Sequence, residues 1–448
     1  MAIVDISAHV GRRARRTEFH VVDRGVLPDI DKHPTWWHGQ RGPGGAQSKY
    51  TPLTSLGDYI YMCENTATFP GSAVNLTGRV AKIRKSDHVE VDAATLSTAG
   101  GDHAAGHQTA SIGVSGAGTV IGHTGQHAAP LDAFYMDSSD LSGTIEAVPV
   151  PTGATERADY RTFYRSPSGD LYLTIRGQVP STTLRWGWLY KWNESTEEFD
   201  IVGNSPFAAT SPDHGYPAIR LAWSGGVMYA LLERAVQGSG WPYPHVGMIK
   251  STDGGTTWTN LTGDSVTLPA SQSQMTTVFG GTGSEAANTS MFVDSQGRPV
   301  VSGAWNAGSG LMRLHVAVWD PAAEEFRTGE LNHKVGDWNY VPDMVGTNAI
   351  FGNGHYVFFA RHTGHGHWPL MMYVGHESDD FTRWDRWTLD ATGDFAGAHT
   401  DFHSLEDDGI VRITPVSMHP DDLESIPTVG DPLQSEIWEF PLPPWGES

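Results

Sequence analysis

The sequence predicts an all-β protein folded as one β-propeller, and three observations support this. Residues 251–258 read Ser-Thr-Asp-Gly-Gly-Thr-Thr-Trp, the Asp-box pattern that marks the outer hairpin of a propeller blade. Strand-like runs separated by turn signals recur along the chain. The 448 residues include 52 glycines and 27 prolines and only 18% charged residues, which is typical of many short strands joined by tight turns.

The Asp-box turn explains why its residue types are needed. The Asp253 carboxylate can accept backbone N–H groups of its own turn, and Gly255 can adopt a positive φ. Trp258 then returns to a hydrophobic layer. We therefore expect a tight hairpin between two outer strands.

The strand-like runs are rich in β-branched, aromatic and other apolar residues, and several follow a Gly-containing turn. They are 59–62, 119–122, 171–175, 227–232, 315–319 and 356–360. Looser forms of the Asp-box hairpin occur at 193–199 and 378–384, each a polar turn that ends in an aromatic residue. This repetition predicts a meander of similar units.

The chain shows no linker, low-complexity tract or charge run, so residues 1–448 are interpreted as one domain. Seven blades would average 64 residues (448/7), more than the roughly 40–50 of compact propeller repeats, so we expect inserted loops on one face. A six-bladed ring and a separate C-terminal subdomain stay open as alternatives. The last strand-like segment, 437–442, is expected to join an N-terminal strand such as 18–22 in one blade and close the ring.

The net charge of −22 argues against nucleic acid as a partner, because a surface of that sign repels phosphates. No segment reaches the roughly 18 apolar residues of a membrane helix, so no membrane insertion is expected. The single cysteine, Cys63, excludes an intrachain disulfide. The N-terminal residues lack the apolar run of a secretory signal, which leaves secretion with the signal removed or a place in a phage particle.

Histidines flank a predicted hairpin in the first third of the chain. His107 precedes the strand-like residues 111–114, and His127 follows the strand-like residues 119–122. A strand–turn–strand arrangement brings both imidazoles to one end of the hairpin, where they can neutralise an acid or exchange protons near neutral pH. Chance clustering of the 21 histidines is the alternative.

A Tyr before one strand and an Arg at the end of the next occur twice. Tyr160 and Arg176 are 16 residues apart, and Tyr216 and Arg234 are 18 apart. The repetition predicts that both pairs lie on one rim of the ring. Each pair taken alone could also be structural, with the Arg paired to a carboxylate such as Glu233.

These stretches resemble the BNR-repeat propeller polysaccharide lyases, closest to the ulvan lyases and related rhamnose–glucuronate lyases. The resemblance rests on 102–131 with its two histidines, on Tyr160 with Arg176, on Tyr216-Pro217 with Arg234 and on the Asp box that follows. It covers roughly residues 100 to 260, and it implies a lyase that cleaves a uronate-containing glycan by β-elimination. An anionic polysaccharide is then the partner, outside the cell, and the chemistry requires no cofactor.

The resemblance also implies the roles of the site residues. A lyase offsets the charge of the uronate carboxylate, removes the α proton and protonates the leaving oxygen. The catalytic residues implied are His107, His127, Tyr160 and Tyr216, and the substrate-binding residues are Arg176, Arg234, His103 and His123. Arginine forks suit a carboxylate.

A second histidine group lies near the C-terminus. His399, Asp401 and His403 offer three ligands in five residues and could bind a structural calcium or zinc ion. Histidines 362, 365 and 367 belong to the same group. The alternative is that these side chains are solvated or hydrogen-bonded.

Two other classes of function compete with the lyase. One is a glycan-binding propeller without catalysis, such as a phage tail or surface-attachment protein with virion tail partners. The other is a glycoside hydrolase on the same scaffold. Sialidase is disfavoured, because the chain has no Arg-Ile-Pro.

Overall fold

The structure is a computed structural model that describes most of the chain. The described residues are 19–38, 51–68, 75–96, 109–125, 131–151, 158–178, 185–204, 206–207, 214–236, 245–280, 286–306, 313–331, 346–347, 349–361, 369–393, 395–417 and 434–445.

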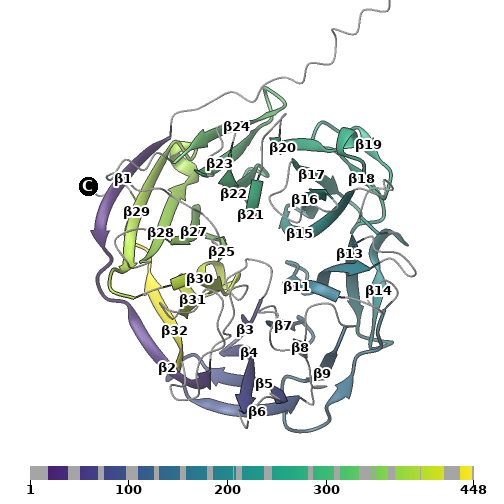
Figure 1. Ribbon diagram of the computed structural model, residues 1–448, viewed down its shortest axis with the longest axis vertical. Helices are drawn as coiled ribbons and strands as arrows, with labels where there is room; N and C mark the ends of the chain where they lie inside the picture. Colours follow the sequence, from purple (N-terminus) through teal and green to yellow (C-terminus); the bar gives the residue numbers. More distant parts are fainter. Residues whose placement is uncertain are drawn as a thin grey trace, which may run out of the picture.

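The described residues form seven sheets arranged in a ring, so the protein is a seven-bladed β-propeller (Figure 1). This confirms the predicted fold and excludes the six-bladed alternative. Within blades 1 to 5 the chain runs from an inner strand near the ring axis toward the outer edge, whereas the outermost strands of blades 6 and 7 come from the N-terminal segment (Figure 1).

Blades 1 to 4 take the first two thirds of the chain. Blade 1 contains β3 (Leu53–Leu56), β4 (Tyr59–Thr68), β5 (Asn75–Arg84) and β6 (Glu90–Leu96). Blade 2 contains β7 (Thr109–Val114), β8 (Thr119–Gly125), β9 (Ala133–Asp137) and β10 (Glu146–Ala147). Blade 3 contains β11 (Ala158–Arg165), β12 (Leu171–Gln178), β13 (Arg185–Asn193) and β14 (Glu198–Ile201), followed by the 3₁₀ turn η3 (Val202–Asn204). Blade 4 contains β15 (His214–Ser224), β16 (Val227–Val236), β17 (His245–Ser251), β18 (Trp258–Thr259), β19 (Ser265–Val266), η4 (Gln272–Gln274) and β20 (Thr276–Gly280).

Blades 5 to 7 complete the ring. Blade 5 contains β21 (Ala286–Val293), β22 (Pro299–Trp305), β23 (Arg313–Asp320) and β24 (Glu325–Glu330). Blade 6 contains β26 (Ile350–Gly352), β27 (His355–Arg361), β28 (Leu370–His376), η5 (Glu377–Asp379), β29 (Arg383–Asp390) and the N-terminal β1 (His20–Val26). Blade 7 contains β25 (Gly346–Thr347), β30 (Phe395–Thr400), the short helix α1 (Ser404–Asp407), β31 (Ile410–Ser417), β32 (Gln434–Pro441) and the N-terminal β2 (Asp31–His38).

The N-terminal segment closes the ring across two blades. β2 pairs antiparallel with the C-terminal β32 in blade 7, whereas β1 pairs parallel with β29 in blade 6. An N-terminal strand does join the C-terminal strand in one blade, as predicted, but that strand is β2, whereas residues 20–22 of the segment given as the example belong to β1. Pro28 follows the end of β1 and Asp29 has a φ of 58°, so the chain turns there and only the second strand reaches β32.

Neighbouring blades pack face to face through apolar side chains, and strand glycines permit close approach. A Cβ on Gly122 would lie 2.6 Å from Val80 of blade 1, and one on Gly113 would lie 2.7 Å from Phe163 of blade 3. Successive residues of a strand face opposite sides, so blade 2 contacts both neighbours in this way. These contacts leave no room for a larger residue at either glycine.

The turn at 251–258 has the geometry that the sequence predicts. Asp253 Oδ1 accepts the backbone N–H of Thr257 at 2.9 Å, and Gly255 has a φ of 95°. Trp258 is buried and donates its indole N–H to the carbonyl of Gly255 at 2.9 Å. The turn joins β17 to β18, the third and fourth strands of blade 4 in order from the axis.

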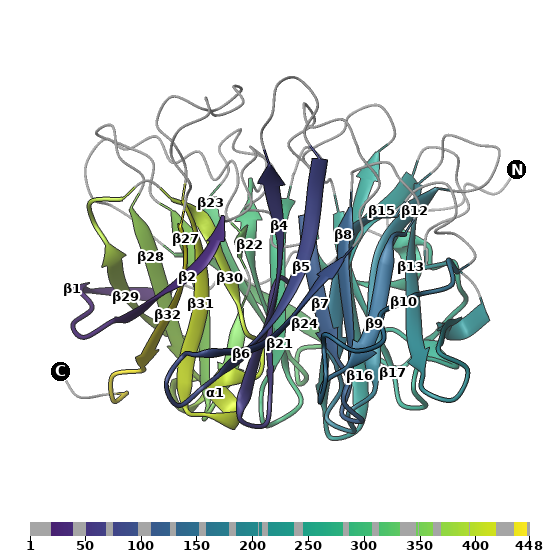
Figure 2. The same ribbon diagram turned by 90° about the horizontal axis from the view of Figure 1, so that it is seen from below.

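The two faces of the ring can be told apart by the direction of the strands. In each antiparallel blade the inner strand begins, and the second strand ends, on the same face. We call this face the rim. Helix α1 connects the inner β30 to β31, so it lies on the opposite face (Figure 2).

Candidate functional site

Tyr160 and Arg176 form a close pair at the rim of blade 3. Tyr160 lies on β11 and Arg176 on β12, and the Arg176 guanidinium carbon stands 4.2 Å from the centre of the Tyr160 ring. Both side chains are 8% exposed. Sequence analysis selected these two residues, and the structure brings them together.

A β-bulge sets the position of Tyr160. The register between β11 and β12 shifts between Asp159 and Thr162, and Tyr160 has a φ of 52°. A positive φ is unfavourable for a bulky aromatic residue, and such strain gathers at functional sites. The bulge changes the direction of the tyrosine relative to a regular strand.

The same bulge recurs in blade 4. The register between β15 and β16 shifts between Gly215 and Ala218, so Tyr216 has the backbone position in blade 4 that Tyr160 has in blade 3. Arg234 lies near the end of β16, as Arg176 does on β12. Tyr216 thus occupies the rim position of Tyr160, but the register places Ala235, not Arg234, at the position equivalent to Arg176, so Arg234 is offset by one residue along β16. The side chains of Tyr216 and Arg234 are outside the described residues.

The predicted histidine hairpin is present as strands β7 and β8. Thr109 pairs with Gly125, so β7 begins and β8 ends at the rim. His103, His107 and His127 lie outside the described residues.

His123 is placed differently from the prediction. It lies on β8 with 0% of its surface exposed, and its Nδ1 contacts the backbone carbonyl oxygen of Asp132. Burial, together with the nearby Arg161, holds the pKa of His123 well below its usual range, so the ring is neutral. A fully buried side chain does not reach a surface glycan, and the substrate-binding role predicted for His123 is corrected to a structural one.

Arg161 is a site residue that sequence reasoning missed. It follows Tyr160 on β11, is 1% exposed, and its charge acts on both His123 and Asp132. Arg161 thus places a buried positive charge next to Tyr160 in the chain. An arginine within the run Tyr-Arg-Thr-Phe was the available signal, since charged residues rarely occupy a buried strand without a role.

Buried polar contacts also tie blade 4 to blade 5 beneath the Arg234 position. Glu233 is 0% exposed and accepts the backbone N–H of Thr289 at 2.9 Å and its hydroxyl at 2.6 Å. Arg220 Nε donates to the Thr289 carbonyl at 3.0 Å. Glu233 is thus held by the neighbouring blade.

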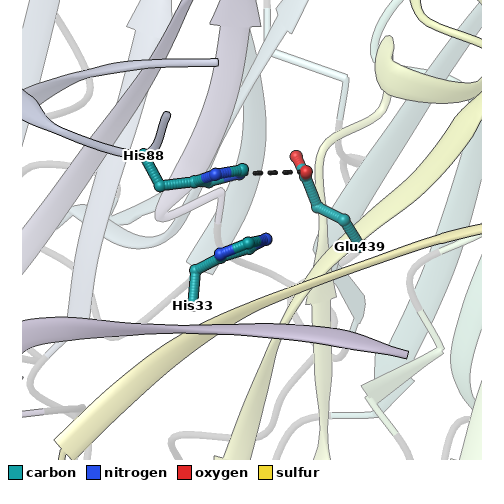
Figure 3. Close-up of side chains that lie close together, drawn as sticks. All are labelled: His33, His88 and Glu439. Carbon is teal, nitrogen blue, oxygen red and sulfur yellow. Dashed lines mark hydrogen bonds and ion pairs between the residues drawn. The ribbon is translucent and has the colours of Figure 1, made fainter. Parts of the chain in front are cut away.

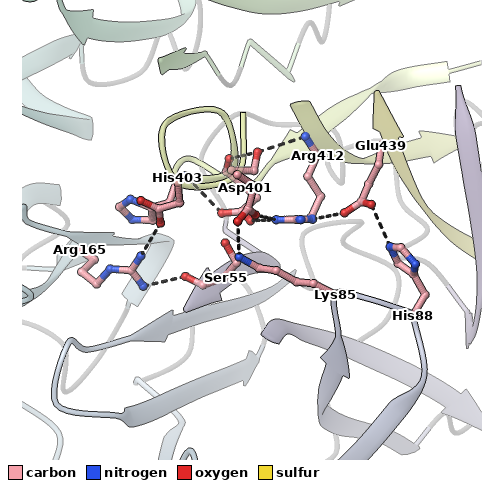
Figure 4. A network of polar contacts seen from close by, with 11 residues as sticks. Ser55, Lys85, His88, Arg165, Asp401, His403, Arg412 and Glu439 are labelled. Atoms are coloured by element: carbon pink, nitrogen blue, oxygen red, sulfur yellow. Dashed lines mark hydrogen bonds and ion pairs between the residues drawn. The ribbon is translucent and has the colours of Figure 1, made fainter. Parts of the chain in front are cut away.

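The residues predicted to bind a metal near the C-terminus do not form a ligand set. Asp401 is fully buried, and its Oδ2 accepts a hydrogen bond from Arg412 Nη1 at 2.8 Å (Figure 4). His399, Asp401 and His403 are all described, yet their ligand atoms do not gather in one place. The Asp401 carboxylate, which the prediction assigns to the metal, instead neutralises a buried arginine. Histidines 362, 365 and 367 lie outside the described residues.

Within the described part of the chain, one group of three side chains brings metal-ligand atoms within 4.8 Å of one another: His33, His88 and Glu439. It lies where blade 7 meets blade 1, away from the Tyr160–Arg176 pair. Among the described residues no helix is long and apolar enough to cross a membrane.

Comparisons with known proteins agree with the architecture. The model of the BNR repeat-containing family matches residues 79–334. The fold is similar to that of the polysaccharide lyase Uly1, with a TM-score of 0.63 at 11% identity over 96% of this chain and 98% of that one. It is also similar to a PL25 ulvan lyase bound to -[GlcA(1-4)Rha3S]-, with a TM-score of 0.61 at 12% identity over 86% and 93% of the two chains. No curated protein matches the chain.

Proposed function

The chain belongs to the BNR repeat-containing family, and from this premise we propose that it is a polysaccharide lyase. It cleaves a uronate-containing glycan by β-elimination, and the glycan is of the ulvan or rhamnose–glucuronate type. One observation carries the proposal: Arg176 lies against Tyr160, whose backbone is strained into a bulge at the rim.

The pair supplies two of the groups that elimination requires. A guanidinium binds the substrate carboxylate and stabilises the negative charge that grows on it when the neighbouring C–H proton is removed. A phenol beside that cation can move a proton. Arg161 adds a second, buried positive charge next to Tyr160 in the chain.

We assign the reaction as follows. Arg176, Arg234 and one histidine hold the uronate carboxylate. Tyr160 or His107 removes the α proton, and the electron pair forms a carbon–carbon double bond as the bond to the glycosidic oxygen breaks. The other tyrosine, Tyr216, or His127 donates a proton to the leaving oxygen. The reaction needs neither water nor a cofactor.

Several lines support a glycan of this type. The PL25 ulvan lyase of similar fold carries a glucuronate–rhamnose sulfate ligand. A chain with a net charge of −22 needs local cations to bind a polyanion, and Arg176 supplies one at the rim. Such polymers lie outside cells, so we place the activity there.

The test is ultraviolet absorbance during incubation with ulvan and glucuronate–rhamnose polymers, because only elimination creates the absorbing conjugated double bond. We expect a rising signal for the wild type. Tyr160→Phe and Arg176→Lys should each lower kcat/KM by about 100-fold or more, the range for loss of one proton-transfer or charge-stabilising group.

Two matched variants serve as controls. Tyr135→Phe removes a hydroxyl on β9 that donates to Glu146 of β10 at 2.8 Å. Arg84→Lys alters a surface ion pair with Asp87. Both should retain wild-type rates. A wild type that binds these glycans without any absorbance change would overturn the lyase in favour of a binding propeller, and new reducing ends without absorbance would indicate a hydrolase.

A further inference from the structure

Three side chains from distant parts of the sequence meet at the seam that closes the ring. His33 lies on β2, Glu439 on β32, and His88 in the turn between β5 and β6. One ligand atom from each residue, an imidazole nitrogen or a carboxylate oxygen, lies within 4.8 Å of the other two (Figure 3). The N-terminal strand, the C-terminal strand and blade 1 thus each contribute one residue.

Strand register explains how His33 and Glu439 share a face. His33 pairs with Ile437, and Glu439 lies two residues further along β32, so both side chains project to the same side of blade 7. Ile437 is buried against apolar residues of blade 1, which identifies the side that faces that blade.

His88 is held toward this pair by an unfavourable backbone conformation. Its φ is 56°, and its N–H donates to the carbonyl of Arg84 at 2.9 Å within the turn. The His88 and His33 rings are stacked, with centres 3.4 Å apart and planes 7° apart, and both point toward Glu439. Two imidazoles brought together in this way, one from a strained residue, need a physical reason.

The carboxylate is already oriented. One oxygen of Glu439 accepts from Arg412 Nε, and the other lies 2.9 Å from His88 Nε2. A carboxylate fixed by a second hydrogen bond is the usual support of a metal-ligating group. Glu439 is 12% and His88 is 16% exposed, so an ion can reach the site from solvent.

The surrounding charges favour a cation. The network behind Glu439 contains four carboxylates, Asp401, Asp407, Asp408 and Glu439, but three fixed cations, Lys85, Arg165 and Arg412 (Figure 4). Asp31 adds a further negative charge near His33.

We propose that His33, His88 and Glu439 bind a divalent transition-metal ion of the zinc class, which joins the first and last strands to blade 1. Two nitrogens and one oxygen suit zinc, and water completes a tetrahedral shell. Ligand atoms of such a shell are about 3.3 Å apart, from bond lengths of about 2.0–2.1 Å, so small side-chain rotations suffice.

The experiment uses the full chain after removal of metals with EDTA. The protein is dialysed against Zn²⁺, bound zinc is measured by elemental analysis, and the unfolding temperature is recorded with and without zinc. Co²⁺ is added in parallel, because its visible absorbance reports a tetrahedral site. The variants are His33→Gln and His88→Gln, and the control is His20→Gln, which changes an exposed histidine on β1.

We expect wild type and His20→Gln to bind one zinc per chain, to show the Co²⁺ absorbance and to unfold at a higher temperature with zinc. In His33→Gln and His88→Gln, zinc affinity should fall by more than about tenfold, the smallest loss expected for a coordinating group. Circular dichroism checks that both variants are folded.

Two results would overturn the proposal. One is a wild type that retains no stoichiometric zinc, a result that stands even if the variants unfold. The other is folded His33→Gln or His88→Gln protein that binds zinc as the wild type does, which would place the ion on other histidines among the 21 of the chain.

Discussion

The face of a strand on which a residue lies decides whether its side chain is buried in this ring. Ile121 and His123 are two apart on β8, and both are fully buried toward blade 3. The alternation of side chains along β8 could therefore have predicted that His123 is buried. The sequence interpretation instead grouped His123 with the neighbouring histidines as a substrate-binding residue. Tyr160 was found because its pairing with Arg176 repeats in the sequence, whereas Arg161 has no such repeat.

His403 gives the fold a dependence on pH. Burial, with a contribution from the nearby Arg165, lowers the pKa of His403 to about 4. Burial alone would raise the pKa of Asp401, but Arg412 and other partners outweigh it, so that pKa lies below its ordinary value. Because the pKa of each group is lower in the folded chain than in the unfolded chain, the unfolded chain binds more protons as the pH falls.

We therefore expect stability to fall as the solution is acidified. Protonation of His403 lowers stability as the pH falls from its unfolded pKa of about 6.5 toward its folded value. Protonation of Asp401 lowers stability further at pH values below its unfolded pKa of about 3.9. Unfolding in urea should show a loss of about 2 kcal/mol between pH 7 and pH 4.5. His403→Gln should flatten this part of the curve, and an unchanged slope in that variant would contradict the assignment.

Elements of this protein end in turns that return an aromatic residue to the core. Trp258 donates to the carbonyl of Gly255 at 2.9 Å, and Trp384 donates to that of Phe381 at the same distance. Both turns join the third and fourth strands of a blade. The hairpins were predictable because their chemistry is local, with every partner within a few residues.

Trp258 should be a main source of stability in blade 4. It is 3% exposed and packs edge to face on Phe207, with ring centres 4.9 Å apart. Trp258→Ala should destabilise the protein by about 3–5 kcal/mol, since it leaves a large cavity. Trp258→Phe keeps part of the volume and should cost less. Equal unfolding midpoints for the two variants would show that the indole volume is not what matters.

Pairing between distant strands was harder to predict than the strands themselves. The six strand-like runs fall on β4, β8, β12, β16, β23 and β27. The identity of the N-terminal strand that meets β32 was wrong, because hydrophobic pattern shows which segments are strands but contains no information about their partners. The His33–His88–Glu439 group was also missed, because its three residues come together only when the ring closes.

At the scale of the whole molecule, stability depends on closure of the ring. β1 covers the edge of β29 and β2 covers the edge of β32. An uncovered strand edge can pair with another chain. The two strands differ in importance, since only β2 connects the start of the chain to its end.

Two deletions separate these contributions. Removal of residues 1–27 eliminates β1, and removal of residues 1–38 eliminates β2 as well. We expect the longer deletion to lower the unfolding temperature by roughly 10 °C more than the shorter one and to cause aggregation, which scanning calorimetry and light scattering would detect. Identical transitions for the two proteins would mean that β2 does not hold the ring.

The pairing of β2 with β32 also has a consequence for biosynthesis. Asp31 pairs with Glu439, 408 residues later (439 − 31). At about 5–20 residues per second, a ribosome needs roughly 20–80 seconds to make the intervening chain. During that time the strands made first have no partner, and they carry residues that discourage wrong pairing, such as Asp23 and Arg24 on β1 and Lys32 and Pro34 on β2. A nascent chain that stalls before blade 7 would leave β2 exposed, and one that stalls before β29 would leave both strands exposed.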